Sequence, residues 1–394
     1  MISIQEAKDR IEQYCHQLSS EKRTVQGSLG YVLFEDLISP IDLPGFRQSA
    51  MDGFALKRAD LENGIREFKI ISEIQAGPAE DVELNSGETA RIFTGAKVPD
   101  LADIVVIQEK TEYTDHVLKI LEYSSNDKAN LRSIGEQIKK GSVALVKGHE
   151  VNPSSIGFMY SMGLEHIDVI RKPKIAMITT GNELKKTGTN LLSGEIYESN
   201  SATMFAALEQ NGFDFSEQQR IEDTLEESVR QVKLSLEKND VLIISGGISV
   251  GKYDFVKRAL EENGVQEVFY KINQKPGKPM YFGIKNDKLI FALPGNPASL
   301  LTCFYLYLLP ALSMISGRKF MNVKKMKTLV SSFEYRGSRP VFLKAFAKED
   351  SVEVLEGQMS FILKSFAEAN ALVYIHGENR MLEAGSEVEV IPIV

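Results

Sequence analysis

Four short loops in this chain combine glycines, prolines and charged residues, and each follows an apolar run. The clearest spans residues 241–254, which read VLIISGGISVGKYD. The apolar residues at its start fit a strand that is buried on both faces, and the glycines allow positive φ angles and a close approach of the backbone to a ligand. A helix that begins after such a loop presents free amide groups, which favour phosphate. An ordinary strand-to-helix turn could use the same glycines for geometry alone.

Three further loops could do chemistry beside it. Residues 180–183 (TGNE) end in a carboxylate, residues 275–279 (KPGKP) place two lysines on a loop stiffened by prolines, and residues 294–297 (PGNP) open a long helix. Lysines on a stiff loop suit the binding of an oxyanion. The simpler alternatives are that Glu183 is solvated, that Asp254 only stabilises a helix start and that the lysines are surface charges.

The elements that must position these loops alternate between strand and helix from Lys174 to about Gly317. We expect strands at 174–179, 241–244, 265–271 and 289–292, and helices at 202–210, 225–236 and 255–263. This alternation is typical of a parallel sheet with right-handed crossovers. Ligands bind outside the carboxyl ends of such strands, so we expect all four loops to meet at one rim of the sheet.

The rest of the chain follows other patterns. Ser3 and Glu6 form a capping box ahead of apolar residues at helical spacing, which predicts a helix over residues 3–18. Pro44, Gly45 and Gly53 disfavour regular structure over residues 43–55 and leave Asp52 exposed on a loop. From residue 55 to about residue 147, short alternating strands separated by turn residues predict a β-rich module. Residues 153–170 have a helical pattern, and the C-terminal part has short strands around one helix near 361–369.

Composition narrows the possible functions. With 394 residues the chain is long enough for several domains, and its 43% hydrophobic and 25% charged residues are typical of a soluble globular protein. No run approaches the ~20 apolar residues that a membrane helix needs. A net charge of −8 argues against a protein that works by neutralising nucleic-acid phosphates. The start of the chain lacks the features of a signal peptide, which predicts a cytoplasmic location.

Metal chemistry would have to use carboxylates. The two cysteines, Cys15 and Cys303, lie far apart without metal-ligand spacing, and the five histidines are scattered. We therefore expect any metal ion to be bound by Asp and Glu side chains.

Five motifs in a fixed order resemble one known family. They are AMDGF at 50–54, FTGA at 93–96, SGGISVGKYD at 245–254, KPGKP at 275–279 and LPGNP at 293–297. Each is modest alone, but the set resembles the MoeA molybdopterin molybdenumtransferases, also represented by the gephyrin E domain, and the resemblance runs nearly end to end. It implies an enzyme that inserts molybdate into adenylylated molybdopterin, releasing AMP and molybdenum cofactor, with the help of a divalent cation, Mg²⁺.

The resemblance also implies an architecture and partners. The fold would be multidomain α/β plus β, in an elongated homodimer. Its domains would be a discontinuous N-terminal linker or dimerisation domain (1–42 and 141–172), a β-rich module (43–140), a central parallel-sheet α/β molybdopterin-binding domain (173–320) and a small C-terminal β-barrel-like domain (321–394). Pterin and oxyanion substrates are expected, a molybdopterin adenylyltransferase and molybdoenzyme maturation proteins are candidate partners, and neither nucleic acid nor a membrane is expected.

By this resemblance, the site residues fall into three sets. The catalytic set is Asp52, Glu183 and Asp254, with Asp52 supplied by the partner subunit, and the metal-binding set is Glu183, Asp223 and Asp254. The substrate-binding set is Thr94, Gly95, Ser245, Gly246, Gly247, Ser249, Gly251, Lys275, Gly277, Lys278, Pro294, Gly295, Asn296 and Arg339. The chemistry agrees, because cleaving a phosphoanhydride beside a tetrahedral oxyanion calls for carboxylates to hold Mg²⁺ and for cations and amides to hold the anions.

The chain departs from the family pattern at two positions. The family usually carries Gly-Glu-Asp and Gly-Asp-Glu where this chain has Gln137 and Asn182 in place of the aspartates. Both keep an oxygen ligand but lose its charge, which weakens binding of a hard cation. The alternatives are therefore a weaker transferase, a tungstate-preferring insertase, or a non-catalytic molybdopterin-binding paralogue or scaffold. A nucleotide-processing enzyme that shares only the α/β domain would not require Asp52 or Arg339.

Overall fold

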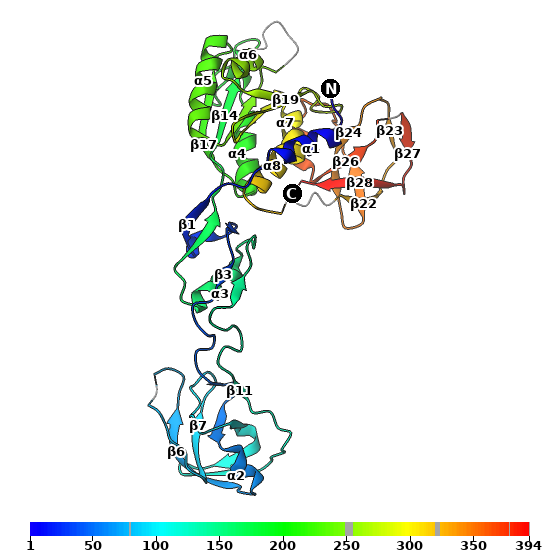
Figure 1. The fold of residues 1–394 in the computed structure, drawn as a ribbon. Helices are drawn as coiled ribbons and strands as arrows, with labels where there is room; N and C mark the ends of the chain where they lie inside the picture. Colours follow the sequence, from blue (N-terminus) through cyan, green and yellow to red (C-terminus); the bar gives the residue numbers. More distant parts are fainter. Residues whose placement is uncertain (79, 249–254, 320–323, 378, 394) are drawn as a thin grey trace. The chain divides into compact units, whose positions relative to one another are not determined.

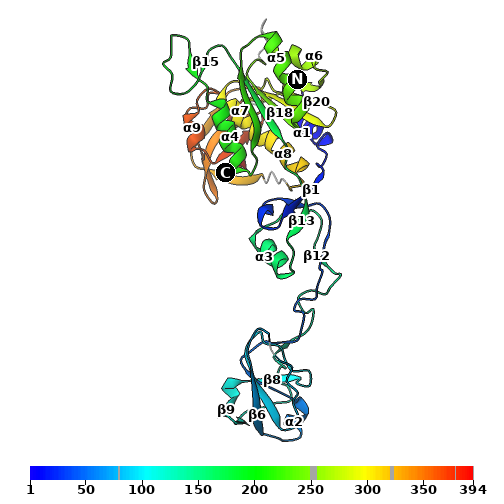
Figure 2. The same cartoon turned by 90° about the vertical axis from the view of Figure 1, so that its left-hand side faces the viewer.

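The structure, a computed structural model, describes residues 1–78, 80–248, 255–319, 324–377 and 379–393. Figures 1 and 2 show its helices and strands in two views. The chain forms two compact units, one made of Met1–Glu21, Gly30–Val32 and Asp168–Val394 and the other of Lys22–Leu29 and Leu33–Ile167. The larger unit holds an α/β sheet and a β-barrel, whereas the smaller unit is rich in β-strands.

A six-stranded sheet forms the centre of the larger unit, in the order β17-β14-β18-β21-β20-β19. Its strands are β14 (Ile175–Thr180), β17 (Phe215–Ile221), β18 (Val241–Ser245), β19 (Gln266–Tyr270), β20 (Tyr281–Lys285) and β21 (Lys288–Leu293). β17, β14, β18 and β21 are parallel neighbours, but β20 is antiparallel to both β19 and β21. The two reversals return β19 to the direction of β21. The carboxyl ends of all strands except β20 therefore lie at one edge, where the sequence predicts the ligand loops.

Helices cover both faces of this sheet. One face packs against α1 (Ile4–Gln13), α4 (Asn200–Gln210), α7 (Pro297–Cys303) and α8 (Leu309–Ile315), and the other against α5 (Leu225–Lys238) and α6 (Phe255–Glu262) (Figure 1). Successive strand residues alternate between the two cores, because Met177 and Ile243 lie in the first and Ile178 and Ile244 in the second. Both β14 and β18 are buried along their whole length, which explains their continuous apolar sequence.

The long helical run of the core is Pro297–Ile315, in which the π-helical segment Phe304–Leu308 joins α7 to α8. Among the described residues it is the one helix long and apolar enough to cross a membrane, but most of it is buried inside the protein. Leu300, Phe304 and Leu308 have no exposed surface. The run is therefore a core helix of the α/β sheet.

The C-terminal end of the larger unit forms a closed barrel in the order β22-β25-β24-β26-β28, which confirms the expected small β-barrel. Its strands are β22 (Lys325–Leu329), β24 (Val341–Ala347), β25 (Ser351–Val354), β26 (Ala371–Ile375) and β28 (Glu387–Pro392), beside α9 (Lys364–Glu368) and the pair β23 (Phe333–Tyr335) and β27 (Arg380–Leu382). Along β24, Leu343 and Ala345 lie in the barrel core, whereas Phe342 packs into the core of the α/β sheet. The barrel and the sheet thus share packed side chains.

The smaller unit is built on a second six-stranded sheet, in the order β8-β5-β7-β6-β10-β9. Its strands are β5 (Gly53–Leu56), β6 (Glu67–Ile74), β7 (Glu88–Ile92), β8 (Ile104–Ile107), β9 (Thr111–Tyr113) and β10 (Val117–Ile120), with helix α2 (Arg58–Glu62). Outside these two sheets lie α3 (Pro153–Ser161) and the short strands β1 (Ser20–Thr24), β2 (Val32–Leu33), β3 (Leu37–Ile38), β4 (Gln48–Ser49), β11 (Leu131–Arg132), β12 (Val143–Leu145), β13 (His166–Ile170), β15 (Leu184–Lys185) and β16 (Ile196–Tyr197).

Two predicted helices are longer than the observed ones. α1 begins with the predicted Ser3–Glu6 capping box but ends at Gln13, five residues before the expected end. The pattern over 153–170 divides into α3 and strand β13, and Gly163 lies between them with a φ of +75°. A glycine in that conformation ends a helix, because the next amide can no longer continue the helical hydrogen bonds.

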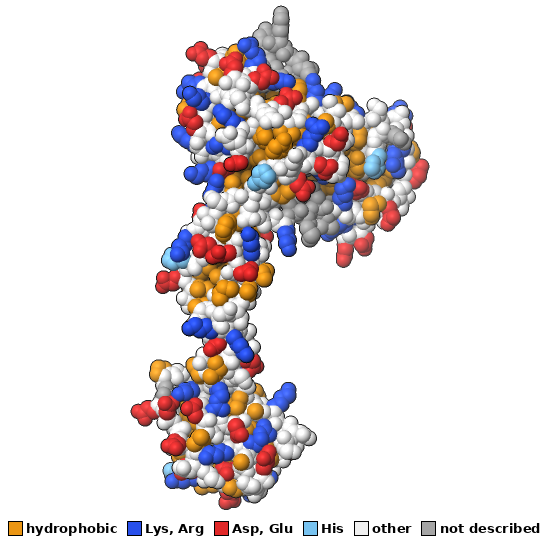
Figure 3. Space-filling model, in the orientation of Figure 1, with side chains coloured by type: hydrophobic (Ala, Val, Ile, Leu, Met, Phe, Trp, Pro, Cys, Tyr) orange, Lys and Arg blue, Asp and Glu red, His pale blue; other side chains and the backbone are white. Residues whose placement is uncertain are grey.

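On the face of the molecule drawn in Figure 3, acidic and basic side chains are interspersed, and apolar side chains emerge in small patches between them. The large apolar side chains that are fully buried include Tyr307, Phe213 and Phe291 of the α/β sheet and its helices. The site must therefore be sought in a specific pocket rather than in a field of one charge.

Candidate functional site

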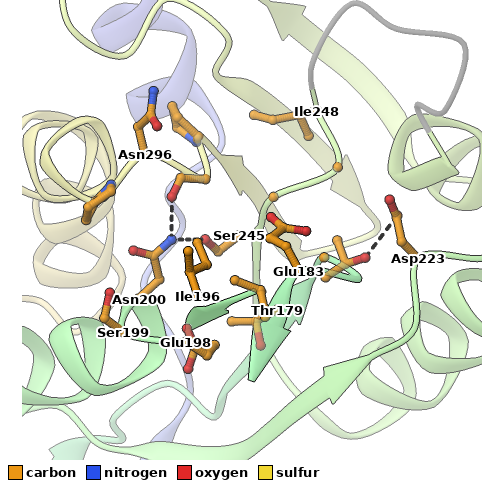
Figure 4. Close-up of a pocket in the computed structure, with 18 of the residues that line it drawn as sticks. Thr179, Glu183, Ile196, Glu198, Ser199, Asn200, Asp223, Ser245, Ile248 and Asn296 are labelled. Atoms are coloured by element: carbon orange, nitrogen blue, oxygen red, sulfur yellow. Dashed lines mark hydrogen bonds between the residues drawn. The ribbon is translucent and has the colours of Figure 1, made fainter. Parts of the chain in front are cut away.

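A pocket of about 550 Å³ opens at the carboxyl ends of β14, β18 and β21. Figure 4 shows side chains from the loops after these strands around one space. The predicted site residues that line it are Glu183, Asp223, Ser245, Gly246, Gly247, Pro294, Gly295 and Asn296. Three of the four predicted loops therefore meet here, and the fourth contributes Pro279.

The glycines after β18 are required by close packing. Gly246 and Gly247 have φ angles of +93° and +64°, a region that L side chains rarely adopt. A Cβ atom at Gly246 would lie 2.4 Å from the carbonyl oxygen of Thr180, and one at Gly247 would lie 2.5 Å from a methyl group of Val256. Only glycine lets this loop lie against the end of β14 and form a wall of the pocket.

Three carboxylates of the described residues line the pocket, Glu183, Glu198 and Asp223, and the first and the last of them follow β14 and β17. The Asp223 carboxylate accepts a hydrogen bond from the hydroxyl of Thr180 at 3.0 Å, which is the dashed line at Asp223 in Figure 4. The backbone amide of Asp223 donates to the side-chain oxygen of Asn182 at 3.4 Å. Glu183 follows in the same loop and lines the same space. Carboxylate oxygens are the ligands that Mg²⁺ prefers, so the donor set on this wall fits that ion.

A complete set of metal ligands is not present among the residues with described coordinates. In that part of the chain, no group of three His, Cys, Asp or Glu side chains could hold one metal ion. The third predicted ligand, Asp254, lies outside the described residues, as do Ser249 and Gly251 of the same loop.

Asn200, at the start of α4, is a pocket residue that the sequence analysis missed. Its amide nitrogen donates to the Ser245 hydroxyl at 2.9 Å and to the Gly295 carbonyl oxygen at 2.8 Å, so one side chain joins two loops of the site (Figure 4). The Asn200 side-chain oxygen and the Thr179 hydroxyl are buried, and neither has a hydrogen-bond partner among the residues that the structure describes. Both residues line the pocket, and such unpaired polar atoms are costly unless a ligand satisfies them. The signal in the sequence was the Asn200-Ser201 pair directly before the predicted helix.

A segment of the barrel end of the chain also reaches the pocket, and the sequence analysis did not predict it. The backbone oxygen of Ser360 accepts a hydrogen bond from the Ala298 amide at 3.1 Å, and its hydroxyl accepts one from the Asn296 side chain at 3.0 Å. The next residue, Phe361, lines the pocket although 63% of its surface is exposed. The pocket therefore has one wall from beyond the α/β sheet.

The predicted basic residues gather beside the barrel rather than in the lining of this pocket. Lys275 pairs with β24, because its amide donates to Pro340 at 2.9 Å and its carbonyl oxygen accepts from Phe342 at 2.8 Å. This pairing brings the exposed Lys275 and Lys278 loop next to the strand that Arg339 precedes.

The buried side chain of Gln274 fixes the Lys275–Lys278 loop. A Cβ atom at Gly277 would lie 2.6 Å from the sulfur of Cys303, so this glycine is required by packing. Gln274 has no exposed surface, donates to the Pro276 carbonyl oxygen at 3.0 Å and accepts from the Tyr307 hydroxyl. Burial raises the pKa of the Cys303 thiol, which is therefore a packing group rather than a nucleophile.

Asp52, Thr94 and Gly95 lie together in the smaller unit. The Asp52 carboxylate accepts from the backbone amide and from the hydroxyl of Thr94, both at 2.7 Å. These two hydrogen bonds lower the pKa of Asp52, so it is ionised at neutral pH. Gly95 has a φ of +84° and its amide donates to the carbonyl oxygen of Ser49 at 2.8 Å, which shapes the turn that presents Thr94.

Comparisons with known proteins cover nearly the whole chain. Residues 2–163 match the family described as MoeA N-terminal region (domain I and II), residues 176–314 match a probable molybdopterin binding domain, and residues 330–393 match the MoeA C-terminal region (domain IV). A molybdopterin molybdenumtransferase of Staphylococcus epidermidis is 32% identical over 99% of this chain and 95% of its own. One of Haemophilus influenzae is 30% identical over 100% of this chain and 98% of its own.

A solved structure is also similar over the full length. The crystal structure described as the molybdopterin biosynthesis MoeA protein from Pyrococcus horikosii has a TM-score of 0.85 and 28% sequence identity, and the match covers 100% of this chain and 99% of that one. The order of the three matched regions is the order of the β-rich unit, the α/β sheet and the barrel.

Proposed function

This chain belongs to the MoeA family of molybdopterin molybdenumtransferases, and we propose that it binds its pterin substrate in the pocket at the carboxyl ends of β14, β18 and β21. It is a transferase of molybdenum cofactor biosynthesis that inserts molybdenum. In the reaction we propose, adenylylated molybdopterin and molybdate are the substrates, and AMP is released together with molybdenum cofactor.

The observation that carries this proposal is the meeting of glycine loops and carboxylates in one pocket. The loops at Gly246–Gly247 and Pro294–Asn296 bring the backbone close to a ligand, and Glu183 and Asp223 add negative charge to the lining of the same pocket. Backbone amides of the loops suit the phosphate of the pterin substrate. The two carboxylates suit a divalent cation, which a reaction that cleaves a phosphoanhydride requires. The unpaired oxygens of Thr179 and Asn200 add acceptors for the N–H groups of a heterocycle.

We propose Glu183, Asp223 and Asp254 as the residues that hold Mg²⁺. The ion would neutralise charge on the phosphoanhydride oxygens. Thr180 holds the Asp223 carboxylate in place through its hydroxyl, so the side chain is oriented before a ligand arrives. Lys275, Lys278 and Arg339 would bind the oxyanion, because their charges gather along one strand of the barrel and its neighbouring loop.

We propose a cytoplasmic homodimer in which Asp52 and Thr94 of one subunit complete the site of the other. Asp52 is ionised and already ordered by Thr94, as a group that acts on a partner's substrate must be. We also propose the division into domains at 1–42 with 141–172, 43–140, 173–320 and 321–394. A molybdopterin adenylyltransferase that delivers the substrate and a maturation protein that accepts the product are the proposed partners.

Release of AMP tests this proposal. Purified protein is mixed with adenylylated molybdopterin and Mg²⁺, with molybdate, with tungstate or with no oxyanion, and both AMP and metal-loaded pterin are measured. The expected result is release of AMP that depends on molybdate and yields loaded cofactor. Absence of release under every condition would contradict the proposed reaction.

The second candidate is a pterin-binding protein without turnover, and it is favoured by Gln137 and Asn182. The structure gives Asn182 a contact of its own, because its side-chain oxygen accepts from the Asp223 amide. An aspartate there could make the same hydrogen bond and would add charge. Tight binding of molybdopterin without release of AMP would identify this candidate, and release with tungstate alone would identify a tungstate-preferring insertase.

A further inference from the structure

A buried lysine of the barrel donates hydrogen bonds to the segment that contains Phe361. Lys344, on β24, is 3% exposed, and its ammonium group donates hydrogen bonds to the backbone oxygens of Gly357, Met359 and Ile362 at 2.6, 3.3 and 2.9 Å. We call residues 355–363, which have no regular secondary structure, the strap. The three carbonyl groups lie on both sides of Phe361 in the sequence. One side chain therefore fixes the strap before and after the residue that reaches the pocket.

A second residue of the strap ties it to the same strand. The side chain of Gln358 accepts from the Lys344 backbone amide at 2.9 Å and donates to the Lys344 carbonyl oxygen at 2.8 Å. At its other side the strap is fastened to the start of α7 by the two hydrogen bonds of Ser360. Hydrogen bonds to β24 and to the start of α7 thus fix residues 357–362 of the strap, and Phe361, within this segment, lines the pocket.

Burying the Lys344 ammonium has a cost that a stability role alone explains poorly. Burial lowers the pKa of Lys344 to about 8, because the charged form has lost water. A well-packed apolar side chain is often as stabilising as a buried charge, but it could not bind three carbonyl groups at once. What the lysine adds is a defined position for the strap.

Phe361 is large, apolar and 63% exposed at the edge of the pocket. Aromatic side chains in such positions bind the faces of flat rings, because stacking removes apolar surface of both partners from water. We propose that Phe361 stacks on a flat heteroaromatic ring of the substrate, and that Lys344 is the positioning residue that holds it there. This inference rests on the proposed function and adds a specificity-determining residue to the same site.

Adenylylated molybdopterin has two rings with this chemistry, the pterin and the adenine. Equilibrium binding of molybdopterin alone and of AMP alone distinguishes them, because removal of Phe361 weakens only the ligand whose ring it contacts.

The test compares Phe361→Ala and Phe361→Tyr with the wild-type chain. We expect Phe361→Ala to raise the KM for adenylylated molybdopterin about fivefold to tenfold, while kcat and the KM for molybdate change less than about twofold. Phe361→Tyr keeps a ring and should retain the wild-type KM. Since Phe361 is exposed, its removal does not threaten folding. An unchanged KM for Phe361→Ala, or a fall in kcat alone, would overturn the stacking role.

The Lys344 arm needs a control of the same chemistry. Lys327, on β22, also donates from its ammonium group to backbone oxygens of the barrel, at Lys348 and Glu349, but it does not touch the strap. We expect Lys344→Met to raise the KM as Phe361→Ala does, Lys344→Arg to restore it, and Lys327→Met to leave it unchanged. The double variant Lys344→Met/Phe361→Ala should have the KM of Lys344→Met, because both act through the same ring.

Two outcomes would contradict the positioning role. The first is a Lys344→Met variant with a lower melting temperature but a wild-type KM, and the second is an equal rise in KM for Lys327→Met. If Lys344→Met does not fold, Lys344→Gln is measured in its place, because its shorter and neutral side chain cannot bind all three carbonyl groups. Its KM should rise as well, and a wild-type KM in that variant would also contradict the role. Failure of the wild-type chain to release AMP would contradict the proposed function instead, and ligand binding by Phe361→Ala would still decide the stacking role.

Discussion

The side-chain amide of Asn200 and the hydroxyl of Ser245 are joined by a hydrogen bond of 2.9 Å, and the same amide nitrogen donates to Gly295 at 2.8 Å. The start of α4 therefore connects the loops that follow β18 and β21. Those loops come from neighbouring strands of the sheet, and their separation sets the width of the pocket. Asn200 is in this sense a spacer between two walls of the site.

The first prediction concerns this spacer. Asn200→Ala removes two hydrogen bonds, each worth about 1 kcal/mol, and should lower kcat/KM for the pterin substrate by tenfold or more. Asn211→Ala is the control, since Asn211 follows the other end of α4, its side-chain amide donates to the carbonyl oxygen of Ala207 at 2.8 Å, and it is not among the residues that line the pocket. Steady-state kinetics of both variants check the prediction, and equal losses would contradict it.

The second prediction concerns the cation. Glu183→Gln and Asp223→Asn keep the size of the side chains but remove charge from the pocket wall. Each should raise the Mg²⁺ concentration needed for half-maximal AMP release by at least about tenfold, because neutral oxygens bind hard cations weakly. Titration of activity with Mg²⁺ measures the shift. A variant with the wild-type requirement would remove that residue from the metal site.

A third prediction tests whether Asp52 acts across a dimer. Asp52→Ala and Asp223→Ala should each be inactive, but mixing and re-equilibrating the two should restore about one quarter of the wild-type specific activity. Half of the dimers would then be mixed, and each mixed dimer would have one intact site of two. No recovery after subunit exchange, in a mixture shown to contain mixed dimers, would place Asp52 in the site of its own subunit or outside the site.

The fourth prediction separates the packing of the glycine loop from its backbone angle. Gly246→Ala would bring a methyl group within 2.4 Å of the Thr180 carbonyl oxygen, so it should abolish binding of molybdopterin. Gly188 also has a positive φ, +89°, but a Cβ atom there would meet nothing within 4 Å. Gly188→Ala should therefore cost only the backbone strain, about 1 kcal/mol, and leave binding intact. Pterin binding and thermal melting of both variants check this.

The fifth prediction concerns stability and pH. Burial raises the pKa of Asp240, but hydrogen bonds from Arg171 at 2.6 and 2.8 Å and from the Lys174 amide at 2.8 Å outweigh it, and the net pKa is lowered. Asp240→Asn should lower the free energy of unfolding by about 2 kcal/mol at pH 7. The control Asp214→Asn, at an exposed position, should change the free energy of unfolding little.

The pH dependence of that difference follows from its sign. A lowered pKa means that the stabilisation is complete above the unfolded value of 3.8 and is lost as the pH falls through the lower folded value. Chemical denaturation of wild-type and Asp240→Asn protein at pH 7 and at a series of pH values below 3.8 measures the loss. An equal difference in unfolding free energy at all of these pH values would contradict the assignment.

Much of the α/β sheet was predictable because its strands are buried on both faces. Continuous apolar runs such as β18 and β21 have few other interpretations, and the loops after them could be placed at one edge. β20 was missed because the two-residue turn at Asn286 and Asp287, which joins it to β21, was not recognised as a hairpin. Asn286 has a φ of +53°, which is the conformation that such turns require.

The site was predictable only where chemistry is written in local sequence. The glycine loop and the carboxylate that directly follow predicted strands were enough to predict Ser245, Gly246 and Glu183 as site residues. Asn200 and Phe361 were missed because their roles depend on contacts with residues distant in the chain, Gly295 for the first and, for the second, the strap's bonds to Lys344. Such contacts are fixed by tertiary packing, which no spacing within one segment reveals.

The main-chain pairing of Lys275 with Pro340 and Phe342 bears on how the protein denatures. A loop of the α/β sheet and a strand of the barrel share hydrogen bonds there, and Phe342 is buried in the core of the sheet. Opening the barrel would therefore break these hydrogen bonds and expose Phe342 and part of the apolar core of the sheet. The two should melt together as one cooperative transition, so a truncation that ends before β22 would destabilise the pocket at the carboxyl ends of β14, β18 and β21 as well as removing the barrel.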